Sequence, residues 1–321
     1  KRGIRIAAPV ASAAATTIAK EKPHHPVHSY LRGLRWDEKP RLDKWLKTYL
    51  GADDTDYHTA VGSRWLISAV ARIMSAGEGV KADCVLVLEG EQGTLKSSAV
   101  EVLARPWFTD EISQFGSKDT AMQLSGRWII EIPELSGFRE ASLETLKAFL
   151  SRSIDRFRPP YGRHVIDAVR QCVFAATTNE TQYLRDASGD RRFWPVACGW
   201  IDLKKLKSDR DQIWAEAFHR YQLDAKWWLE TEELQKLAEE AQSQRFEMDP
   251  WAEKIKSYLG EKSVNGFSTK DILEICLEIP TDRQNKGHSN RIGRAMKHLG
   301  YKARQVGKGP DRGKWLWVKR V

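Results

Sequence analysis

A glycine-rich turn that leads directly into a lysine and a serine is the stretch of this 321-residue sequence best suited to chemistry. It reads Gly90-Glu91-Gln92-Gly93-Thr94-Leu95-Lys96-Ser97 and lies between an apolar run at 84–88 and a helix predicted from 96 to about 103. Glycine permits the tight bend, and backbone N–H groups of the turn and of the helix N-terminus point at phosphate groups. Lys96 is therefore expected to reach the β- and γ-phosphates of a nucleotide, and the Ser97 hydroxyl to bind Mg²⁺.

Leu95 departs from the phosphate-loop pattern G-x-x-x-x-G-K-[ST], because leucine stands where glycine is usual. Its side chain has to point away from the phosphates if the loop is to bind them. A glycine-rich turn before a helix also occurs in proteins that bind no nucleotide. The loop alone therefore leaves two interpretations open, a phosphate site and an ordinary turn.

Polar residues follow two further predicted strands. Glu131 and Glu134 lie at the carboxyl end of the strand predicted at 127–132, and Asn179 ends the strand predicted at 170–179. Ligands of open parallel sheets bind at the carboxyl ends of the strands. These side chains are expected to hold Mg²⁺, orient water and sense the γ-phosphate.

Two arginines, Arg191 and Arg192, follow soon after. Cationic side chains of this kind can stabilise the charge of a phosphoryl-transfer transition state. The alternative is a solvated or ion-paired surface.

The elements that must position these residues alternate between strands and helices. Helices are predicted at 42–50, 57–74, 96–103, 143–150, 201–221 and 230–244, and strands at 84–88, 107–109, 127–132 and 170–179. Alternation with wholly apolar strands is typical of an α/β fold with a mostly parallel sheet. We predict a flexible segment at 1–25, a helical N-terminal block at 26–80, the α/β core with a helical extension at 81–248, and a separate domain at 249–321.

The net positive charge of the chain arises in the last domain. The chain has a net charge of +9, and residues 251–321 contain 16 Lys/Arg and 7 Asp/Glu, so this segment accounts for the whole excess. A basic terminal module favours nucleic acid as a partner. A solubilising tail is the alternative.

The pattern of this domain predicts a winged helix. A helix is expected at 251–259, a second one capped by Ser268 with Asp271, and a third starting at Ser289 or Asn290 and stopped by Gly300; two strands then flank a turn at 307–313. The third helix is expected to turn Ile292, Ala295, Met296 and Leu299 to the core and to enter the major groove of DNA. The solvent-facing cations that we expect to contact DNA are Arg291, Arg294, Lys297, Lys308, Arg312 and Lys314. A winged helix that binds protein is the alternative.

A further predicted DNA contact lies between the Glu131 and Asn179 strands. Residues 157–169 are expected to form a hairpin, because Pro-Pro-Tyr-Gly at 159–162 is strong turn chemistry. The side chains expected to contact phosphates or stack on bases are Arg156, Arg158, Tyr161, Arg163 and His164. The alternative is a structural loop in which Arg158 pairs with a local acid such as Asp155.

Five segments closely resemble the virulence-associated E family of phages and mobile islands, which is similar to superfamily 3 helicases: LEGEQGTLKSS, GRWIIEIPELSGF, KAFLSRSIDRFRPPYGRHV, RQCVFAATTNETQYLRDASGDRRFWPV and DQIWAEAFHRY. The resemblance covers about residues 26–228. It implies an AAA+-like P-loop ATPase with ATP and Mg²⁺ as cofactors. It also implies a ring, often a hexamer, that moves on single-stranded DNA during replication, often behind a primase domain.

The resemblance also implies residue roles. The Walker A loop runs from Gly90 to Ser98 and comprises Gly90, Glu91, Gln92, Gly93, Thr94, Leu95, Lys96, Ser97 and Ser98. Glu131 and Glu134 resemble Walker B, with Ser97 and Glu131 on the metal and Glu134 favoured for water. Asn179 resembles sensor 1. Arg191 or Arg192 resembles the arginine finger, which acts on the neighbouring subunit's ATP, and the hairpin resembles one that grips DNA inside the ring.

The expected function is therefore an ATP-dependent DNA helicase or translocase that replicates a phage or mobile element in the bacterial cytoplasm. Two alternatives stay open: an ATP-regulated initiator that binds an origin without processive unwinding, and a DNA-binding regulator with a degenerate loop. No apolar run approaches the ~18 residues that span a membrane. The four cysteines form no CxxC pair and are expected to be free thiols without zinc.

Overall fold

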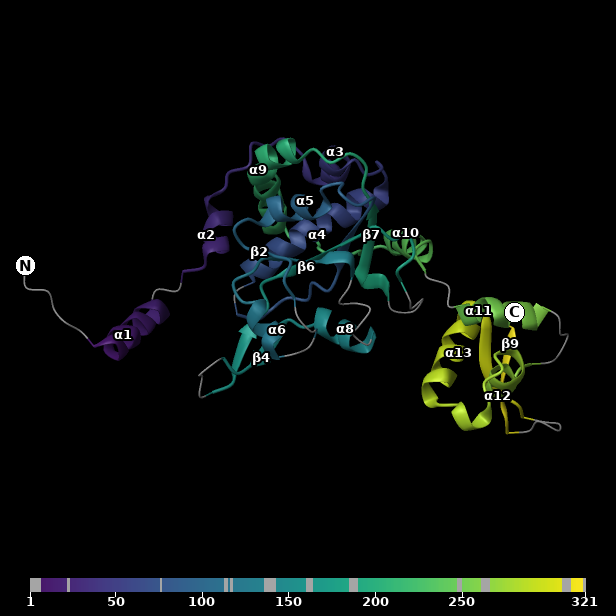
Figure 1. Cartoon of the computed structure of the whole chain (residues 1–321). Helices are drawn as coiled ribbons and strands as arrows, with labels where there is room; N and C mark the ends of the chain where they lie inside the picture. The colour runs from purple at the N-terminus through teal and green to yellow at the C-terminus, as the bar shows by residue number, and fades with distance from the viewer. Residues whose placement is uncertain are drawn as a thin grey trace, which may run out of the picture. The chain divides into compact units, whose positions relative to one another are not determined.

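The computed structural model describes residues 7–21, 24–75, 77–112, 115, 118–135, 143–159, 164–184, 190–246, 250–260, 266–307 and 313–319. The chain divides into two compact units (Figure 1). The first comprises residues 1–180 and 191–239, and the second comprises residues 181–190 and 240–321. The candidate arginine fingers, Arg191 and Arg192, therefore belong to the first unit.

A five-stranded sheet forms the centre of the first unit. Its order is β2 (Phe108–Thr109), β3 (Ile129–Ile132), β6 (Val173–Thr178), β1 (Val85–Glu89) and β7 (Phe193–Ala197), and every neighbouring pair is parallel. The predicted α/β fold with a mostly parallel sheet is confirmed. All four strands expected from the sequence are present, and β7 is an addition, since its proline at 195 and the preceding arginines obscure the strand pattern.

Helices cover both faces of the sheet, which explains why β1, β3 and β6 are buried along their whole length. Helix α4 (Asp56–Met74), α5 (Lys96–Ala104) and α9 (Leu203–Gln222) lie on one face, and α8 (Leu143–Leu150) lies on the other (Figure 1). Buried indoles join these layers: Trp65 donates to the Phe174 carbonyl at 2.9 Å, and Trp214 donates to the Leu103 carbonyl at 2.8 Å. The helix that follows the glycine-rich turn is thus bonded to α9.

The helices predicted before the sheet are also confirmed. Helix α2 spans Pro26–Gly33, the 3₁₀ helix η1 spans Leu42–Lys44, α3 spans Trp45–Leu50, and α4 begins at Asp56. Gly51 ends α3 with φ 65°, in the left-handed region that favours glycine. A side chain there would collide with the backbone of Trp200, since a Cβ atom on Gly51 would lie 2.7 Å from the Trp200 nitrogen.

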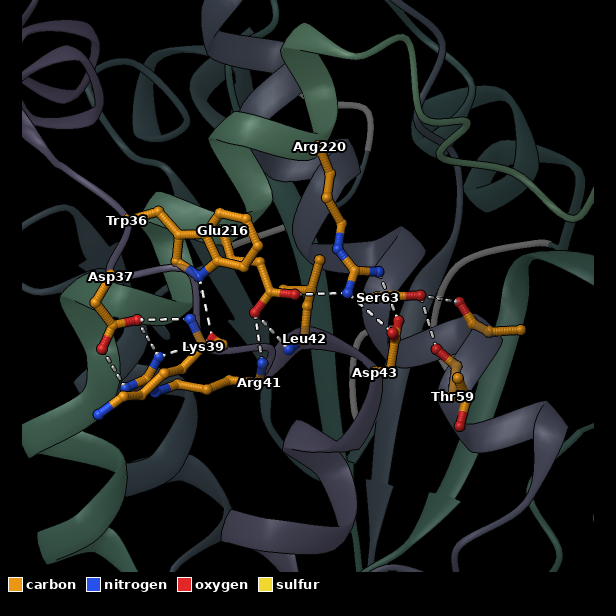
Figure 2. A network of polar contacts seen from close by, with 11 residues as sticks. Trp36, Asp37, Lys39, Arg41, Leu42, Asp43, Thr59, Ser63, Glu216 and Arg220 are labelled. Atoms are coloured by element: carbon orange, nitrogen blue, oxygen red, sulfur yellow. Dashed lines mark hydrogen bonds and ion pairs between the residues drawn. The ribbon is translucent and has the colours of Figure 1, made fainter.

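A buried carboxylate fastens the N-terminal helices to α9 (Figure 2). Glu216 is fully buried, and its Oε2 accepts hydrogen bonds from the backbone N–H groups of Arg41 at 2.5 Å and Leu42 at 2.9 Å. Its Oε1 accepts from Arg220, which also bonds both carboxylate oxygens of Asp43. Two orphan N–H groups at the start of η1 are satisfied in this way, so η1 is anchored to α9.

The outer edge of β7 carries an unusual residue for a strand. Pro195 has no N–H group to donate, and its carbonyl accepts a 3.0 Å hydrogen bond from the Tyr57 hydroxyl of α4. Proline in a sheet is found mainly on edge strands, and β7 is an edge strand.

Further elements of the first unit are two more helices, an antiparallel pair of strands and a helical extension, besides the 3₁₀ turns η2 (Pro133–Leu135) and η3 (Asp190–Arg192). These helices and strands are α1 (Ala8–Glu21), α6 (Lys118–Gln123), β4 (Ile154–Phe157), β5 (Ile166–Val169) and α10 (Glu232–Ser243), the last of which continues into the second unit. Residues 8–21 were expected to lack regular structure but are helical, because alanine, the strongest helix former, dominates them. The strands β4 and β5 pair at Phe157–Ile166 and Ile154–Val169, as expected for a hairpin at this place.

The second unit has its own hydrophobic core. It contains α11 (Pro250–Gly260), α12 (Thr269–Asp271) continued by the π-helical turn η4 (Ile272–Cys276), the 3₁₀ turn η5 (Thr281–Arg283), α13 (Lys286–His298), and the antiparallel strands β8 (Tyr301–Gln305) and β9 (Trp315–Lys319). Ser268 caps α12 by accepting from the Asp271 N–H at 3.0 Å, as predicted. Ile292, Ala295 and Met296 are buried in the core.

Two expectations for α13 need correction. The helix begins at Lys286, not at Ser289 or Asn290, because the Asn285 side chain accepts from the His288 N–H at 3.0 Å and caps it earlier. Arg291 was expected to face solvent, but it is half-buried with its guanidinium 4.0 Å from the centre of the Trp251 ring.

No helix within the described residues combines the length and the apolar character needed to cross a bilayer.

Candidate nucleotide site

The glycine-rich loop, residues 90–95, connects the carboxyl end of β1 to the amino end of α5. Gly90 has φ 150° and Gly93 has φ 83°, so the bend uses backbone conformations that favour glycine. The Gly90 N–H donates to the Thr178 carbonyl at 3.3 Å, which fixes the start of the loop to the end of β6.

Leu95 occupies the residue before α5 with φ 67° and ψ 21°, the left-handed helical region. The backbone therefore adopts the conformation that a glycine at this position would supply, at a cost of about 1 kcal/mol for leucine. The side chain is 48% exposed, so it does not fill the loop. Leucine at this position is compatible with a phosphate-binding loop in conformation.

The Lys96 ammonium lies within the curve of the loop. It donates to the Gly90 carbonyl at 2.8 Å, to the Glu91 carbonyl at 2.7 Å and to the Thr94 hydroxyl at 3.1 Å. The side chain is only 8% exposed. The three oxygens that accept these hydrogen bonds are neutral, so none of them neutralises the charge of the ammonium group. An anionic phosphate would form stronger, charge-assisted hydrogen bonds with Lys96.

Ser97, Glu131 and Thr177 form a second connected group. Glu131 Oε1 accepts hydrogen bonds from the Ser97 hydroxyl at 2.5 Å and from the Thr177 hydroxyl at 2.6 Å. These residues come from α5, β3 and β6, so the parallel sheet brings them together. Thr177 was not predicted from the sequence; its signal was a hydroxyl near the end of an otherwise apolar strand.

Burial raises the pKa of Glu131, and the hydrogen bonds from Ser97 and Thr177 oppose that shift. Glu131 is fully buried, and within the described structure its Oε2 has no hydrogen-bond partner. A buried carboxylate with one orphan oxygen beside a serine hydroxyl is a suitable ligand set for a hard cation that prefers oxygen. The residues present therefore fit Mg²⁺, with Ser97 and Glu131 as the groups that would hold it.

A pocket of about 320 Å³ opens over the loop. Residues of the loop and of α5 line one side, and Pro133, Glu134, Thr177, Thr178 and Asn179 line the other. Its volume is within the ~300–1,000 Å³ of small-molecule sites. The fold thus brings four of the predicted residues to one pocket, namely Lys96, Ser97, Glu134 and Asn179. Glu131 is connected to this pocket through its hydrogen bond from the Ser97 hydroxyl.

Glu134 is exposed and has φ 51°, a left-handed conformation that is rare for glutamate. Such a conformation at a pocket wall is common where a side chain must be aimed at a ligand. Thr178 is the last residue of β6, and Asn179 follows it on the wall of the same pocket.

The two arginines are not brought to this pocket. Both precede β7, which is parallel to β1, so they lie at the amino end of the sheet, opposite the loop. Arg192 forms an ion pair with Asp83 at 3.2 Å and donates to the Ser151 hydroxyl at 3.0 Å, whereas Arg191 is exposed.

The candidate DNA contacts are distributed over both units. In the hairpin, Arg156 lies 3.6 Å from Asp167 across the strands, and Arg158 and His164 are exposed. Asp155 is paired with Arg170, which occupies the position that the alternative interpretation gave to Arg158. Lys297 and Lys314 are exposed in the second unit. Tyr161, Arg163, Lys308, Arg312 and the side chain of Arg294 lie outside the described residues.

The virulence-associated protein E-like domain matches residues 31–247, about two thirds of the chain. The chain belongs to this family. The VapE-like region includes the sheet, the loop, Glu131 and both arginines, and it ends just before α11. The resemblance inferred from the sequence is confirmed.

Among the solved structures that are similar to the VapE-like chain are two that cover 90% of it, whereas no curated protein matches it. One is the A form apo structure of the NrS-1 C-terminal region, with 13% identity, 90% of this chain and 77% of that chain covered, and a TM-score of 0.48. The other is the apo structure of the NrS-1 C-terminal region, with 15% identity, 90% and 78% coverage, and a TM-score of 0.47.

Proposed function

We propose that this chain is an ATP-dependent DNA helicase or translocase that serves replication of a phage or mobile element. The observation that carries the proposal is the convergence of Lys96, Ser97 and Glu131 at the carboxyl end of the parallel sheet. Membership of the virulence-associated protein E-like family supports the same assignment.

The residues divide the work as follows. The loop N–H groups and Lys96 bind and orient the β- and γ-phosphates of ATP. Ser97 and Glu131 hold Mg²⁺, which supplies positive charge for the phosphoryl group when it is bound. Glu134 orients and deprotonates the attacking water, and Asn179 contacts the γ-phosphate from the next strand.

Arg191 is the residue that we assign as the arginine finger. Arg192 contacts Asp83 and Ser151 of its own subunit, while Arg191 is exposed at the amino end of the sheet, opposite the pocket. A finger so placed acts on the ATP of a neighbouring subunit, which accounts for a ring, with six subunits as the proposed number.

DNA is assigned to two places. The β4–β5 hairpin, with Arg158 and His164 exposed, contacts single-stranded DNA through phosphates. The second unit, in which three helices precede an antiparallel pair of strands, is proposed as a winged helix that binds duplex DNA. Its excess positive charge predicts that duplex affinity falls steeply with salt. A duplex affinity that does not change with salt concentration would contradict the proposal that this unit binds DNA.

ATP hydrolysis with and without single-stranded DNA tests the proposal. We expect DNA to stimulate the wild type, and Lys96→Ala to lower kcat by about 100-fold or more, the usual cost of losing a charged group from a transition-state site. Lys204→Ala, an exposed lysine of α9, is the matched control and should retain activity.

Three other outcomes have distinct meanings. Hydrolysis that DNA leaves unchanged, with no strand displaced, contradicts the translocase. An ATP-dependent footprint on one origin sequence in that case favours an initiator. Absence of nucleotide binding favours a DNA-binding regulator with a degenerate loop.

A further inference from the structure

Arg192 connects three segments of the first unit that are distant in the sequence. Its Nε lies 3.2 Å from Asp83 Oδ2, just before β1, and its Nη2 donates to the Ser151 hydroxyl at 3.0 Å. The side chain is only 14% exposed. The Arg192 side chain is therefore fixed at the end of the sheet where the parallel strands begin.

Ser151 belongs to the turn from which the β4–β5 hairpin rises. It follows α8, where its hydroxyl also donates to the Lys147 carbonyl at 2.8 Å, and it precedes β4 by three residues. The next residue is held too, because the buried Arg72 donates to the Arg152 carbonyl at 3.2 Å and to the Ala82 carbonyl at 3.0 Å. The turn at 151–153 and the segment that enters β1 are thus fastened together.

A close backbone approach marks the same contact. A Cβ atom on Gly79, where φ is 68°, would lie 2.8 Å from the Ser153 carbonyl oxygen. Glycine is required at this position both by the conformation and by the space. The base of the hairpin consequently packs directly on the chain that leads to Asp83.

The base of the hairpin is also rigid in itself. Arg170, which follows β5, donates to both carboxylate oxygens of Asp155 in β4, at 2.7 and 2.5 Å, and both side chains are buried. The Arg170 guanidinium lies 4.5 Å from the centre of the Phe149 ring of α8. The base of the hairpin is therefore fixed to the end of α8, next to the turn at 151–153.

We infer that Arg192 is a positioning residue that couples the β4–β5 hairpin to Arg191. The inference rests on the proposed function, in which single-stranded DNA lies on the hairpin and Arg191 faces the ATP of a neighbouring subunit. Arg191 is adjacent in the chain to a side chain that is bonded to the hairpin base, so a shift of Ser151 changes the position of Arg191. DNA on one subunit thereby alters hydrolysis at the next.

Ser151→Ala tests this coupling while leaving the loop, Glu131 and both arginines in place. We expect basal kcat and the KM for ATP to stay within about twofold of the wild type. The factor by which single-stranded DNA stimulates kcat should fall by about fivefold, the size of a modest coupling free energy. Ser75→Ala is the matched control, because Ser75 makes the same bond to the carbonyl four residues earlier, at the end of α4.

Arg192→Lys provides a second variant. Lysine keeps a positive charge beside Asp83, but its single nitrogen does not reproduce the two directions of the guanidinium contact. We expect the same loss of DNA stimulation, with unfolding monitored to confirm that the variant folds.

The outcomes separate the inference from the function on which it rests. If DNA stimulates the wild type and Ser151→Ala equally, the coupling role is wrong and the proposed function stands. A wild type that DNA does not stimulate overturns the proposed function and the coupling with it. A loss of stimulation in Ser75→Ala as large as in Ser151→Ala also overturns the coupling, because the effect would then not depend on Arg192.

Discussion

Leu95 shows how a residue that breaks a sequence pattern can preserve its geometry. The left-handed conformation at φ 67° is the one that glycine adopts without strain, and leucine adopts it here at the start of α5. The exposed side chain explains how this is sterically possible. The deviation from the pattern therefore changes stability more than shape.

Leu95→Gly is accordingly expected to stabilise the protein. Relief of strain of about 1–2 kcal/mol is partly offset by the greater freedom of glycine in the unfolded chain, so we expect a net gain of about 0.5–1 kcal/mol. The midpoint of urea unfolding measures it. Leu223→Gly is the control, since Leu223 is also exposed but has φ −92°, and the substitution there should destabilise. Equal destabilisation by both variants would show that Leu95 is not strained.

Glu131→Gln tests the charge of the buried carboxylate. Because the folded-state pKa is raised, the folded protein binds the proton more tightly than the unfolded chain does. The resulting stabilisation is present below the ordinary value of 4.5 and is lost as the pH rises through the folded-state pKa. Without bound nucleotide, glutamine should therefore match the wild type in acid and exceed its stability by about 1 kcal/mol at neutral pH.

Hydrolysis by Glu131→Gln should be lost at the same time, since glutamine is a poor magnesium ligand. Thermal unfolding as a function of pH measures the first effect, and phosphate release measures the second. Glu134→Gln, on the exposed wall of the pocket, should also lose hydrolysis. A Glu131→Gln variant that is less stable than the wild type at neutral pH would contradict the assignment.

At the scale of elements, the hairpin has one buried ion pair and one exposed ion pair. Arg170 and Asp155 are buried at its base, whereas Arg156 and Asp167 are 76% and 62% exposed farther along the strands. A buried pair leaves an uncompensated charge when one partner is removed, but an exposed pair contributes little. The base of the hairpin should therefore be far more sensitive to substitution than its strands.

Arg170→Met is predicted to destabilise the protein by about 3–5 kcal/mol, whereas Arg156→Met should change stability by less than about 1 kcal/mol. Both variants remove one arginine from the same hairpin, so they form a matched pair for chemical denaturation. Similar effects of the two substitutions would mean that the buried pair does not hold the hairpin.

Elements with a strong local signal were predictable from the sequence. The stop of α3 at Gly51, the helix α4 and the buried strand β6 follow from glycine, from apolar periodicity and from an unbroken apolar run. Strand β7 was missed because Pro195 disfavours a strand, and only the pairing with β1 decides it. Asn285 as the cap of α13 was missed because a serine and an asparagine farther along offered equally good caps.

The site was predictable in its residues but not in its connections. Lys96 follows one predicted strand, and Glu131 and Asn179 stand at the carboxyl ends of two others. The Thr177 bond to Glu131, and the engagement of Arg192 with Asp83 and Ser151, depend on which strands are neighbours. Strand order is a property of the tertiary fold, and short-range patterns do not determine it.

At the scale of the whole molecule, Arg191 and the pocket lie at opposite ends of the sheet, so the function that we propose uses two subunits for one reaction. We predict that Arg191→Ala lowers kcat by about 1,000-fold or more. Mixing it with Lys96→Ala subunits should restore activity, because intact pockets then face intact arginines. Random mixing in equal amounts places such a pair at about a quarter of the contacts in a closed ring, so about a quarter of wild-type hydrolysis is expected.

The control for this mixture is a Lys96→Ala subunit that also carries Arg191→Ala. It offers neither a pocket nor a finger, so its mixture with Lys96→Ala should stay inactive. Full activity of Arg191→Ala by itself would exclude a role between subunits.

The proline in β7 has a consequence for how copies of this protein meet. Its ring removes one donor from the margin of the sheet, and the Tyr57 hydroxyl occupies the adjoining acceptor. At the opposite margin, β2 is only two residues long. In the part of the chain that the structure describes, neither edge strand therefore presents a long, unbroken row of free backbone groups, which disfavours the addition of a foreign strand at these edges.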